Sequence, residues 1–310
     1  MDVHDLRVAN GGRLGNVADL GNIEAAISVL PRHNAEVQID MLRSLPRPLA
    51  YVLPGGGALA AYQVGVLDAL TAAGLQPDRL IGVSAGAMNA ALFAWSSDLE
   101  GVRRLERIWS NVRRRDLLRM HPGRIALALA GKRASFLDNR HGIAFLRKHL
   151  GARLIQHAPI PLTIIATDLS TGRPFMLESG DVVFAIVASS AFPGVFPPVL
   201  LDGHTLIDGG VVADVPLDVA AELGVASVIV ITVPPLAPGT VPQHPVAVAL
   251  RSSTWGVEAH GRTVVARPPD GLRVVEIPTR SSAVTTFAVG SAASTIEEAR
   301  SFTEAWLRSQ

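Results

Sequence analysis

Apolar segments of strand length alternate with helical segments over most of this chain, and this alternation limits the possible folds more than any other feature. Residues 48–55 (PLAYVLPG) are typical of a strand that runs into glycine, and residues 58–73 of a helix that ends at Gly74. The same order follows in residues 78–84 and 85–95. Strands that alternate with helices form mostly parallel sheets covered on both faces. We therefore predict an α/β fold of three layers, α/β/α, with a mostly parallel central sheet.

The rest of the chain continues this pattern less regularly. Further strands are expected at 162–169, 226–233 and 272–278, a hairpin at 171–179, and helices at 22–30, 35–45, 182–190, 216–224 and 295–307. In parallel sheets, functional groups gather at the carboxyl ends of the strands. The glycines after the first strand, Ser84 after the second and Asp208 after a short apolar segment all fall near such ends, so we expect them to share one site.

The composition favours a globular protein and argues against several classes of function. The chain has 310 residues, 48% hydrophobic and 18% charged, which suits a well-buried core. Its 28 Lys and Arg against 27 Asp and Glu give no sign of a nucleic-acid partner. The absence of cysteine rules out disulfides and thiolate ligands, and no His-x-x-x-His or His-Glu-x-x-His pattern occurs. We expect no metal and no cofactor.

Two long uncharged stretches raise the question of a membrane span. Residues 182–201 and 224–250 lack charged side chains, but prolines interrupt both, so we expect core elements joined by loops. The first residues do not combine a basic start with an apolar segment and a cleavage site, so we expect a cytoplasmic protein.

The changes in pattern along the chain predict its organisation. We expect an N-terminal extension over residues 1–46 and one catalytic domain over 47–310. Within that domain we expect a core at 48–235, a basic helical insertion at 101–153 and a C-terminal elaboration at 236–310.

The insertion at 101–153 stands out by its charge. It holds 14 Arg and Lys against three acidic residues, and its apolar residues recur at helical spacing. Such a charge run is often only the solvated face of amphipathic helices. Alternatively, it is a surface that meets anionic lipid head groups, which would place the protein peripherally on the inner face of the membrane.

The segment GVSAG, residues 82–86, fits the pattern G-x-S-x-G between a strand and a helix. In this sharp turn Gly82 and Gly86 are needed where a side chain would collide with the neighbouring strand or helix. Ser84 then stands exposed at a helix N-terminus, where the helix dipole favours a developing alkoxide. Ser84 is therefore our candidate nucleophile.

A serine nucleophile needs a base, and the sequence offers two kinds. Only His244 and His260 follow Asp208, the first in a Pro-rich stretch and the second on an expected helix, and neither position is typical of a catalytic loop. Asp208 opens the segment DGGVVADVPL, in which two glycines permit a close approach of the backbone. A partly dehydrated carboxylate can accept the serine proton directly. Asp208 is the stronger candidate, with a Ser-Asp-His triad as the alternative.

The glycine-rich segment PGGGALAAYQVG, residues 54–65, precedes a helix and could hold either a phosphate or an oxyanion. Gly55, Gly57 and Ala60 fit the dinucleotide pattern G-x-G-x-x-G/A, which also requires an acidic residue after the second strand. That strand ends in Ser84 instead, and no Gly-Lys-Ser/Thr follows the glycines. The segment is therefore better explained as an anion site for a reaction at Ser84.

Four blocks in this order, GGGALAAYQVGVLDAL, GVSAGAMNAAL, ASSAFPGVFPPV and DGGVVADVPL, resemble the patatin-like phospholipase family. The resemblance covers about residues 48–235. It implies a patatin-like fold, a lipid or other acyl ester as substrate, Ser84 as nucleophile and Asp208 as its partner in a dyad. It also implies that the backbone of Gly55, Gly56 and Gly57 forms the oxyanion hole.

One residue in the glycine-rich segment departs from the family pattern, because Ala60 stands where many members have glycine. A methyl group there leaves the N–H donors in place, so we expect it to affect substrate fit. The sequence thus predicts a serine acyl hydrolase that acts through an acyl-enzyme. A non-catalytic lipid-binding scaffold of the same fold is the alternative from another class of protein.

Overall fold

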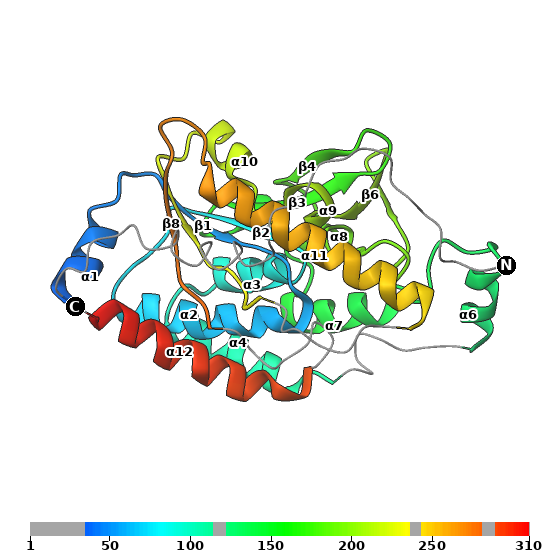
Figure 1. Cartoon of the computed structure of the whole chain (residues 1–310), viewed down its shortest axis with the longest axis horizontal. Helices are drawn as coiled ribbons and strands as arrows, with labels where there is room; N and C mark the ends of the chain where they lie inside the picture. Colours follow the sequence, from blue (N-terminus) through cyan, green and yellow to red (C-terminus); the bar gives the residue numbers. More distant parts are fainter. Residues whose placement is uncertain (1–34, 114–121, 236–242, 281–288, 310) are drawn as a thin grey trace, which may run out of the picture.

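The computed structural model describes residues 35–113, 122–235, 243–280 and 289–309. An eight-stranded sheet runs through the centre of the molecule, in the order β5-β6-β3-β2-β1-β7-β8, with β4 paired to β3 (Figure 1). The strands are β1 (Leu49–Leu53), β2 (Arg79–Val83), β3 (Leu162–Asp168), β4 (Arg173–Leu177), β5 (Val199–Leu201), β6 (His204–Asp208), β7 (Ser227–Val230) and β8 (Arg273–Glu276). The run β3-β2-β1-β7-β8 is parallel, so the predicted mostly parallel sheet is confirmed.

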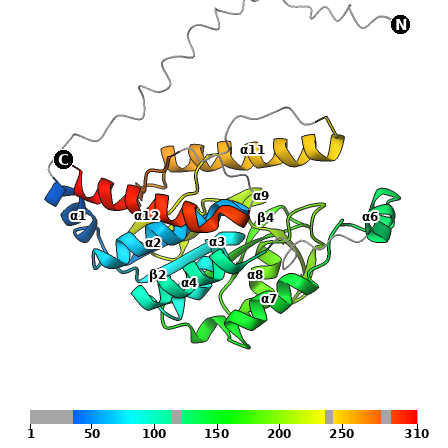
Figure 2. The same cartoon turned by 90° about the horizontal axis from the view of Figure 1, so that it is seen from below.

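Helices cover both faces of the sheet, because alternate side chains of each strand enter two separate cores. Tyr51 and Leu53 of β1 face one core, whereas Ala50 and Val52 face the other. The first core is closed by α2 (Ala61–Ala72), α3 (Ala85–Ala94), α4 (Leu99–Asn111), α7 (Arg140–Leu150), α8 (Val182–Ser189) and α12 (Ala292–Arg308). The second is closed by α9 (Gly210–Ala213), α10 (Leu217–Glu222) and α11 (Pro245–Ala266). Figure 2 shows α11 on one side of the sheet and α4 and α7 on the other, as the three-layer prediction requires.

The remaining elements lie around this core. They are α1 (Ala35–Arg43), α6 (Pro122–Leu129) and the 3₁₀ turns η3 (Gly57–Ala60), η4 (Ile155–His157) and η5 (Val289–Ser291). Helix α1 belongs to the predicted extension, yet it packs on α12 and Leu42 is buried in the first core. Helix α4 opens the predicted basic insertion and packs on α2 and α3. The helix expected at 22–30 lies outside the described residues.

The sequence places His260 on a helix but does not give that helix bounds. Helix α11 spans 22 residues at the end of a Pro-rich stretch. Its first residue is Pro245, and proline is tolerated at that position because the first helical N–H needs no partner within the helix. Of the two uncharged stretches, 182–201 contains α8 and β5, and 224–250 contains β7 and the start of α11. Among the described helices, none combines the length and apolarity needed to cross a bilayer.

Strands β2 and β6 pair with the same edge of β3, one after the other, and this arrangement positions the site. The first half of β3 pairs with β2 in parallel, with Val83 opposite Ile165. The second half pairs with β6 in the antiparallel direction, with Asp208 opposite Ala166. Strand β4 occupies the other edge of β3, so β2 and β6 share one edge. The residue that follows β2 and the last residue of β6 are therefore neighbours.

Candidate functional site

Ser84 lies in the sharp turn between β2 and α3. Its φ of 52° and ψ of −124° are rare for a residue with a side chain, and it is the N-cap of the ten-residue helix α3. The Ser84 N–H donates to Ser189 Oγ at 2.8 Å, and Ser189 Oγ in turn donates to the Ile165 carbonyl at 2.6 Å. The strained turn is thus fastened to β3 through a fully buried hydroxyl group.

The two glycines of this turn lie where the chain leaves no room for a side chain. A Cβ atom at Gly86 would lie 2.1 Å from the carbonyl oxygen of Leu53, and one at Gly82 would lie 2.6 Å from Cα of Ala87. The first contact would separate α3 from β1, and the second would separate β2 from α3. Ser84 therefore depends on both glycines for its position.

Asp208 is held by its backbone and by its side chain. Its N–H donates to the Ala191 carbonyl at 3.1 Å, and its own carbonyl accepts from Thr167 Oγ1 at 2.9 Å. The Gly210 N–H donates to Asp208 Oδ1 at 2.9 Å. These bonds leave Oδ2 directed at the serine.

The structure brings Ser84 and Asp208 together. Ser84 Oγ donates to Asp208 Oδ2 at 2.7 Å, within the range of a hydrogen bond to a carboxylate. Asp208 is only 5% exposed, whereas Ser84 is half-buried and reachable from outside. Burial raises the pKa of Asp208 to about 6, against the opposing effect of its bonds from Ser84 and Gly210. At neutral pH the carboxylate is mostly ionised and can accept the serine proton.

The glycine-rich segment passes beside Ser84, but its three glycines are not equivalent. The Gly55 N–H donates to Asp214 Oδ1 at 2.9 Å, so the expectation that this amide faces an oxyanion does not hold in this structure. Gly56 and Gly57 are half-buried, with φ values of 149° and 58° that favour glycine. Within the described part of the chain, no acceptor binds either of their N–H groups. Those two amides are the available donors.

A buried polar network supports the glycine-rich segment from below. Gln63 Nε2 donates to the Pro54 carbonyl at 2.8 Å, and Asn89 Nδ2 donates to the Ala60 carbonyl at 2.9 Å. Asn89 also donates to Gln63 Oε1 at 2.9 Å and accepts from Trp109 Nε1 at 2.8 Å. Ala60 is fully buried, and its methyl group packs in the first core. Its effect on substrate fit stays a prediction.

The sequence did not single out two residues of this site. Ser189 lies in the block ASSAFPGVFPPV and Asp214 in the block DGGVVADVPL, yet nothing in either block showed what the side chain contacts. For Asp214 the available signal was a second carboxylate six positions after Asp208. For Ser189 there was none beyond its place in the block.

Among the described residues, no histidine hydrogen-bonds to Ser84 or Asp208. The side-chain hydrogen-bond partners of Asp208 among the described residues are Ser84 and Gly210. His260 is exposed on α11, and His244 is exposed just before that helix begins. The described residues also contain no group of three or more side chains suited to hold a metal ion.

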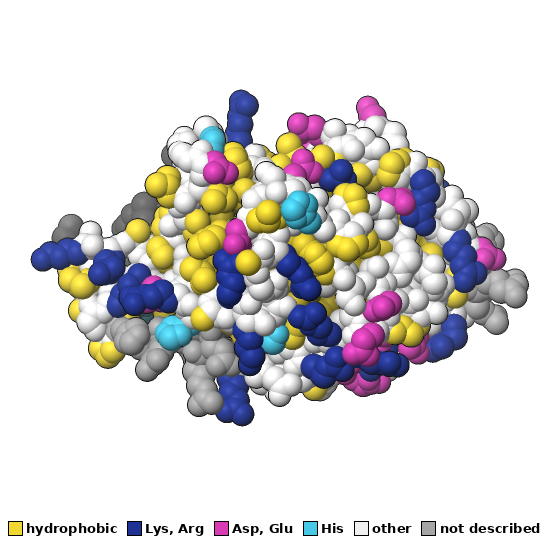
Figure 3. All heavy atoms as spheres, turned by 180° about the vertical axis from the view of Figure 1, so that it is seen from behind, with side chains coloured by type: hydrophobic (Ala, Val, Ile, Leu, Met, Phe, Trp, Pro, Cys, Tyr) yellow, Lys and Arg dark blue, Asp and Glu magenta, His cyan; other side chains and the backbone are white. Residues whose placement is uncertain are grey.

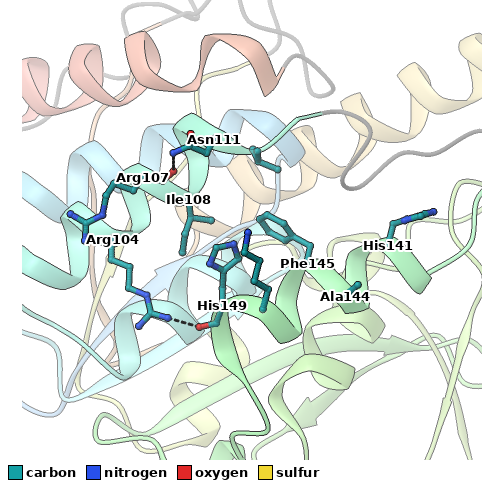
Figure 4. A pocket seen from close by; sticks show the side chains of 10 residues that line it. Arg104, Arg107, Ile108, Asn111, His141, Ala144, Phe145 and His149 are labelled. Atoms are coloured by element: carbon teal, nitrogen blue, oxygen red, sulfur yellow. Dashed lines mark hydrogen bonds between the residues drawn. The ribbon is translucent and has the colours of Figure 1, made fainter.

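A second feature is a groove between α4 and α7, lined by none of the residues above. Its volume is about 1070 Å³. Side chains of the two helices face each other across it (Figure 4). Its lining includes Arg104, Arg107, Ile108, Phe145, Lys148 and His149. Arg104 donates to the His149 carbonyl and Arg107 pairs with Glu100 at 2.8 Å.

Figure 3 shows the face of the molecule turned away from α11, where Lys and Arg side chains lie beside apolar ones.

Comparison with known proteins gives several relatives of this chain. It is 30% identical over 187 residues to neuropathy target esterase sws of Drosophila melanogaster, covering 60% of this chain and 13% of that protein. It is 31% identical over 187 residues to patatin-like phospholipase domain-containing protein 7 of Rattus norvegicus, with the same coverage. An uncharacterized NTE family protein of Mycobacterium tuberculosis is 32% identical over 177 residues, 56% of this chain and 45% of that protein. The match spans less than half the length of each relative.

Among solved structures, human GIVD cytosolic phospholipase A2 in complex with methyl gamma-linolenyl fluorophosphonate is similar at 12% identity and a TM-score of 0.43. That similarity covers 88% of this chain and 60% of that one. The effector ExoU is similar at 18% identity and a TM-score of 0.39, over 85% and 53% of the two chains. The family profile described as patatin-like phospholipase matches residues 51–221, more than half of this chain. The chain therefore belongs to the patatin-like phospholipase family.

Proposed function

We propose that this protein is a serine acyl hydrolase that cleaves the carboxylic ester bonds of lipids through Ser84 and Asp208. The observation that carries the proposal is the 2.7 Å hydrogen bond from Ser84 Oγ to a buried carboxylate oxygen of Asp208. Family membership and the named relatives, an esterase and a phospholipase domain protein, support a lipid ester as the class of substrate.

In the first half of the reaction, Ser84 Oγ attacks the ester carbonyl carbon while its proton passes to Asp208. The N–H groups of Gly56 and Gly57 stabilise the oxyanion of the tetrahedral intermediate. The bond to the leaving alkoxide then breaks, and Asp208 returns the proton to that oxygen. In the second half, Asp208 removes a proton from water, and the water oxygen attacks the acyl carbon. The bond from that carbon to Ser84 Oγ then breaks, Asp208 returns the proton to Oγ, and the carboxylic acid is released.

The test is hydrolysis of a p-nitrophenyl acyl ester and of phospholipid vesicles by the wild type, Ser84→Ala and Asp208→Asn. We expect each variant to lose activity by about 10³-fold or more, because the nucleophile and its base act as a unit. Ser301→Ala on α12 and Asp218→Asn on α10 are matched controls outside the site. Full activity of folded Ser84→Ala would disprove the proposal.

Two further measurements separate the alternatives. A fluorophosphonate should label Ser84, whereas a lipid-binding scaffold has no activated serine to label. Loss of activity in folded His244→Ala or His260→Ala would favour a Ser-Asp-His triad over the dyad.

We further propose that the groove between α4 and α7 contacts anionic lipid. Cationic side chains lie there beside apolar ones, a combination that suits head groups at a membrane surface.

We expect the double variant Arg107→Glu/Lys148→Glu to weaken binding to phosphatidylserine vesicles at least about tenfold. Arg173→Glu/Arg262→Glu, on β4 and α11, is the charge-matched control. Of the arginines that follow α4, Arg114 and Arg115 lie outside the described residues. Equal effects of the two double variants would exclude the groove as the contact.

A further inference from the structure

The carboxylate of Asp214 lies between two parts of the site. It accepts the Gly55 N–H at 2.9 Å, across 159 positions of the sequence. A Cβ atom at Gly55 would lie 3.0 Å from Asp214 Oδ1 and 3.2 Å from Ser84 Cβ. Gly55 is therefore enclosed by Asp214 and Ser84, and the hydrogen bond joins the glycine-rich segment to the end of α9.

Asp208 and Asp214 flank the single turn of α9 and approach the same point in the structure. A Cβ atom at Gly210 would lie 3.2 Å from Asp208 Oδ1 and 3.2 Å from Asp214 Oδ1. One carboxylate binds the hydroxyl group of Ser84, and the other binds the backbone of the segment that passes beside it. The short stretch 208–214 thus contacts both parts of the site.

We propose that Asp214 is a positioning residue whose hydrogen bond to Gly55 fixes the N–H groups of Gly56 and Gly57 over Ser84. The proposal deepens the function proposed above and rests on it for its effect on catalysis. Asp214 itself takes no part in bond making, because its described partner is the amide of Gly55 rather than Ser84 Oγ.

The other hydrogen bonds of the segment hold its carbonyl groups, among them that of Gly56, which accepts the Leu59 N–H at 3.2 Å. Gln63 binds the carbonyl of Pro54, and Asn89 binds the carbonyl of Ala60. Between them the backbone passes through Gly56 and Gly57, which have no side chains to restrict rotation. In the described part of the chain, the bond from Gly55 to Asp214 Oδ1 is the one hydrogen bond that an N–H group of the three glycines donates. Without it, those amides are free to turn away from the oxyanion.

The charge of Asp214 gives the arrangement a dependence on pH. Burial raises the pKa of Asp214 to about 7, the bond from Gly55 opposes this, and the negative charge of Asp208 raises it further. The backbone of the glycine-rich segment and Gly261 of α11 lie near this carboxylate. Asp208, at the end of β6, is the charged group that acts on it. Ionisation strengthens the hydrogen bond to Gly55, so loop order should increase as pH rises through about 7.

The experiment compares wild type, Asp214→Ala and Asp214→Asn, with Asp218→Asn as the control for loss of one carboxylate nearby on the exposed face of α10. With a p-nitrophenyl ester, we expect Asp214→Ala to lower kcat by about 10- to 100-fold, less than the full worth of one oxyanion donor. The KM should change much less than kcat. Asp214→Asn retains an acceptor for Gly55 and should recover most of kcat. Its kcat should rise only with the ionisation of Asp208 near pH 6 and should lack the further rise that Asp214 contributes near pH 7.

Amide hydrogen exchange of the peptide containing residues 54–60 tests the tether without any substrate. We expect faster exchange there in Asp214→Ala, with other peptides unchanged, and wild-type exchange in Asp218→Asn. Unchanged exchange at 54–60, or a folded Asp214→Ala with wild-type kcat, would overturn the proposal. If Asp214→Ala fails to fold, a pH profile of Asp214→Asn identical to that of the wild type would overturn it. Failure of the proposed function has a different signature, because Ser84→Ala would then match the wild type in activity while the exchange result still stands.

Discussion

Asp208 makes the folded protein less stable when it ionises, although the proposed reaction needs it ionised. Its pKa rises from 3.8 to about 6 in the folded chain, chiefly because burial disfavours the charged form. The protonated form is therefore favoured by folding. Its stabilising contribution is complete below pH 3.8 and is lost as pH rises through about 6.

Asp208→Asn should therefore be more stable than the wild type at pH 8, by up to about 3 kcal/mol, because each unit of pKa shift corresponds to about 1.4 kcal/mol. The difference should shrink as pH falls towards 4, where the wild-type side chain is protonated too. Thermal unfolding of both proteins across this pH range measures it. A difference that does not vary with pH would contradict the argument.

The sequence predicted which residues form the site better than it predicted which of them contact each other. Ser84 and Asp208 could be named because each lies in a recognisable turn with glycines at fixed spacing. The engagement of Gly55 by Asp214 could not, because it joins residues 159 positions apart and depends on how α9 sits against the glycine-rich segment. The catalytic roles of Ser84, Asp208, Gly56 and Gly57 stay predictions until the variants are measured.

Among the elements, α2, α3 and α4 are joined beneath the site by hydrogen bonds between buried polar side chains. Gln63, Asn89 and Trp109 come from one helix each and bind one another as well as two carbonyls of the glycine-rich segment. All three are buried, so each polar group depends on its partner.

Asn89→Ala should destabilise the protein by about 2–4 kcal/mol, because it leaves the Trp109 N–H and the Ala60 carbonyl buried without that partner. Asn111→Ala, at the exposed end of α4, is the matched control and should change stability by less than about 0.5 kcal/mol. Urea unfolding gives both values. Equal stability of the two variants would show that the network adds nothing.

The strands and most helices could be predicted because their apolar spacing is regular, as in β1 and β2. Helix α11 was expected at His260 but not over its full length, because the prolines before it are typical of a loop. Its contacts with the second core show which face is apolar. The end-to-end meeting of β2 and β6 on β3 is a matter of register between distant segments, which no local pattern specifies.

For the molecule as a whole, the last helix is bound to the first helix of the core. Helices α12 and α2 approach so closely that a Cβ atom at Gly65 would lie 2.2 Å from the carbonyl oxygen of Ile296. Arg300 of α12 binds Asp68 of α2 and also Glu106 of α4, the latter at 2.9 Å. Helix α12 is thus part of the helical layer that covers the first core.

Gly65→Ala should destabilise the protein by about 1–3 kcal/mol, because the two helices must separate to admit the methyl group. Gly256→Ala in α11 is the matched control: no atom outside the local helix backbone lies within 4 Å of the added Cβ, and alanine favours a helix by about 0.5–1 kcal/mol. Opposite changes in melting temperature are expected. Destabilisation by both variants to the same extent would mean that helix packing is not the cause.

The shared edge of β3 has a consequence for engineering. Because Ser84 and Asp208 are aligned by adjacent positions on one strand, their distance in space does not depend on the sequence between them, although they lie 124 positions apart. The stretch between α4 and α7, residues 112–139, could therefore be exchanged to alter what the protein binds. Helices α4 and α8 must stay, because Trp109 supports the network under the glycine-rich segment and Ser189 binds the Ser84 N–H. The nucleophile and its base would keep their spacing as long as the register of β3 and the hydrogen bond from the Ser84 N–H to Ser189 are preserved.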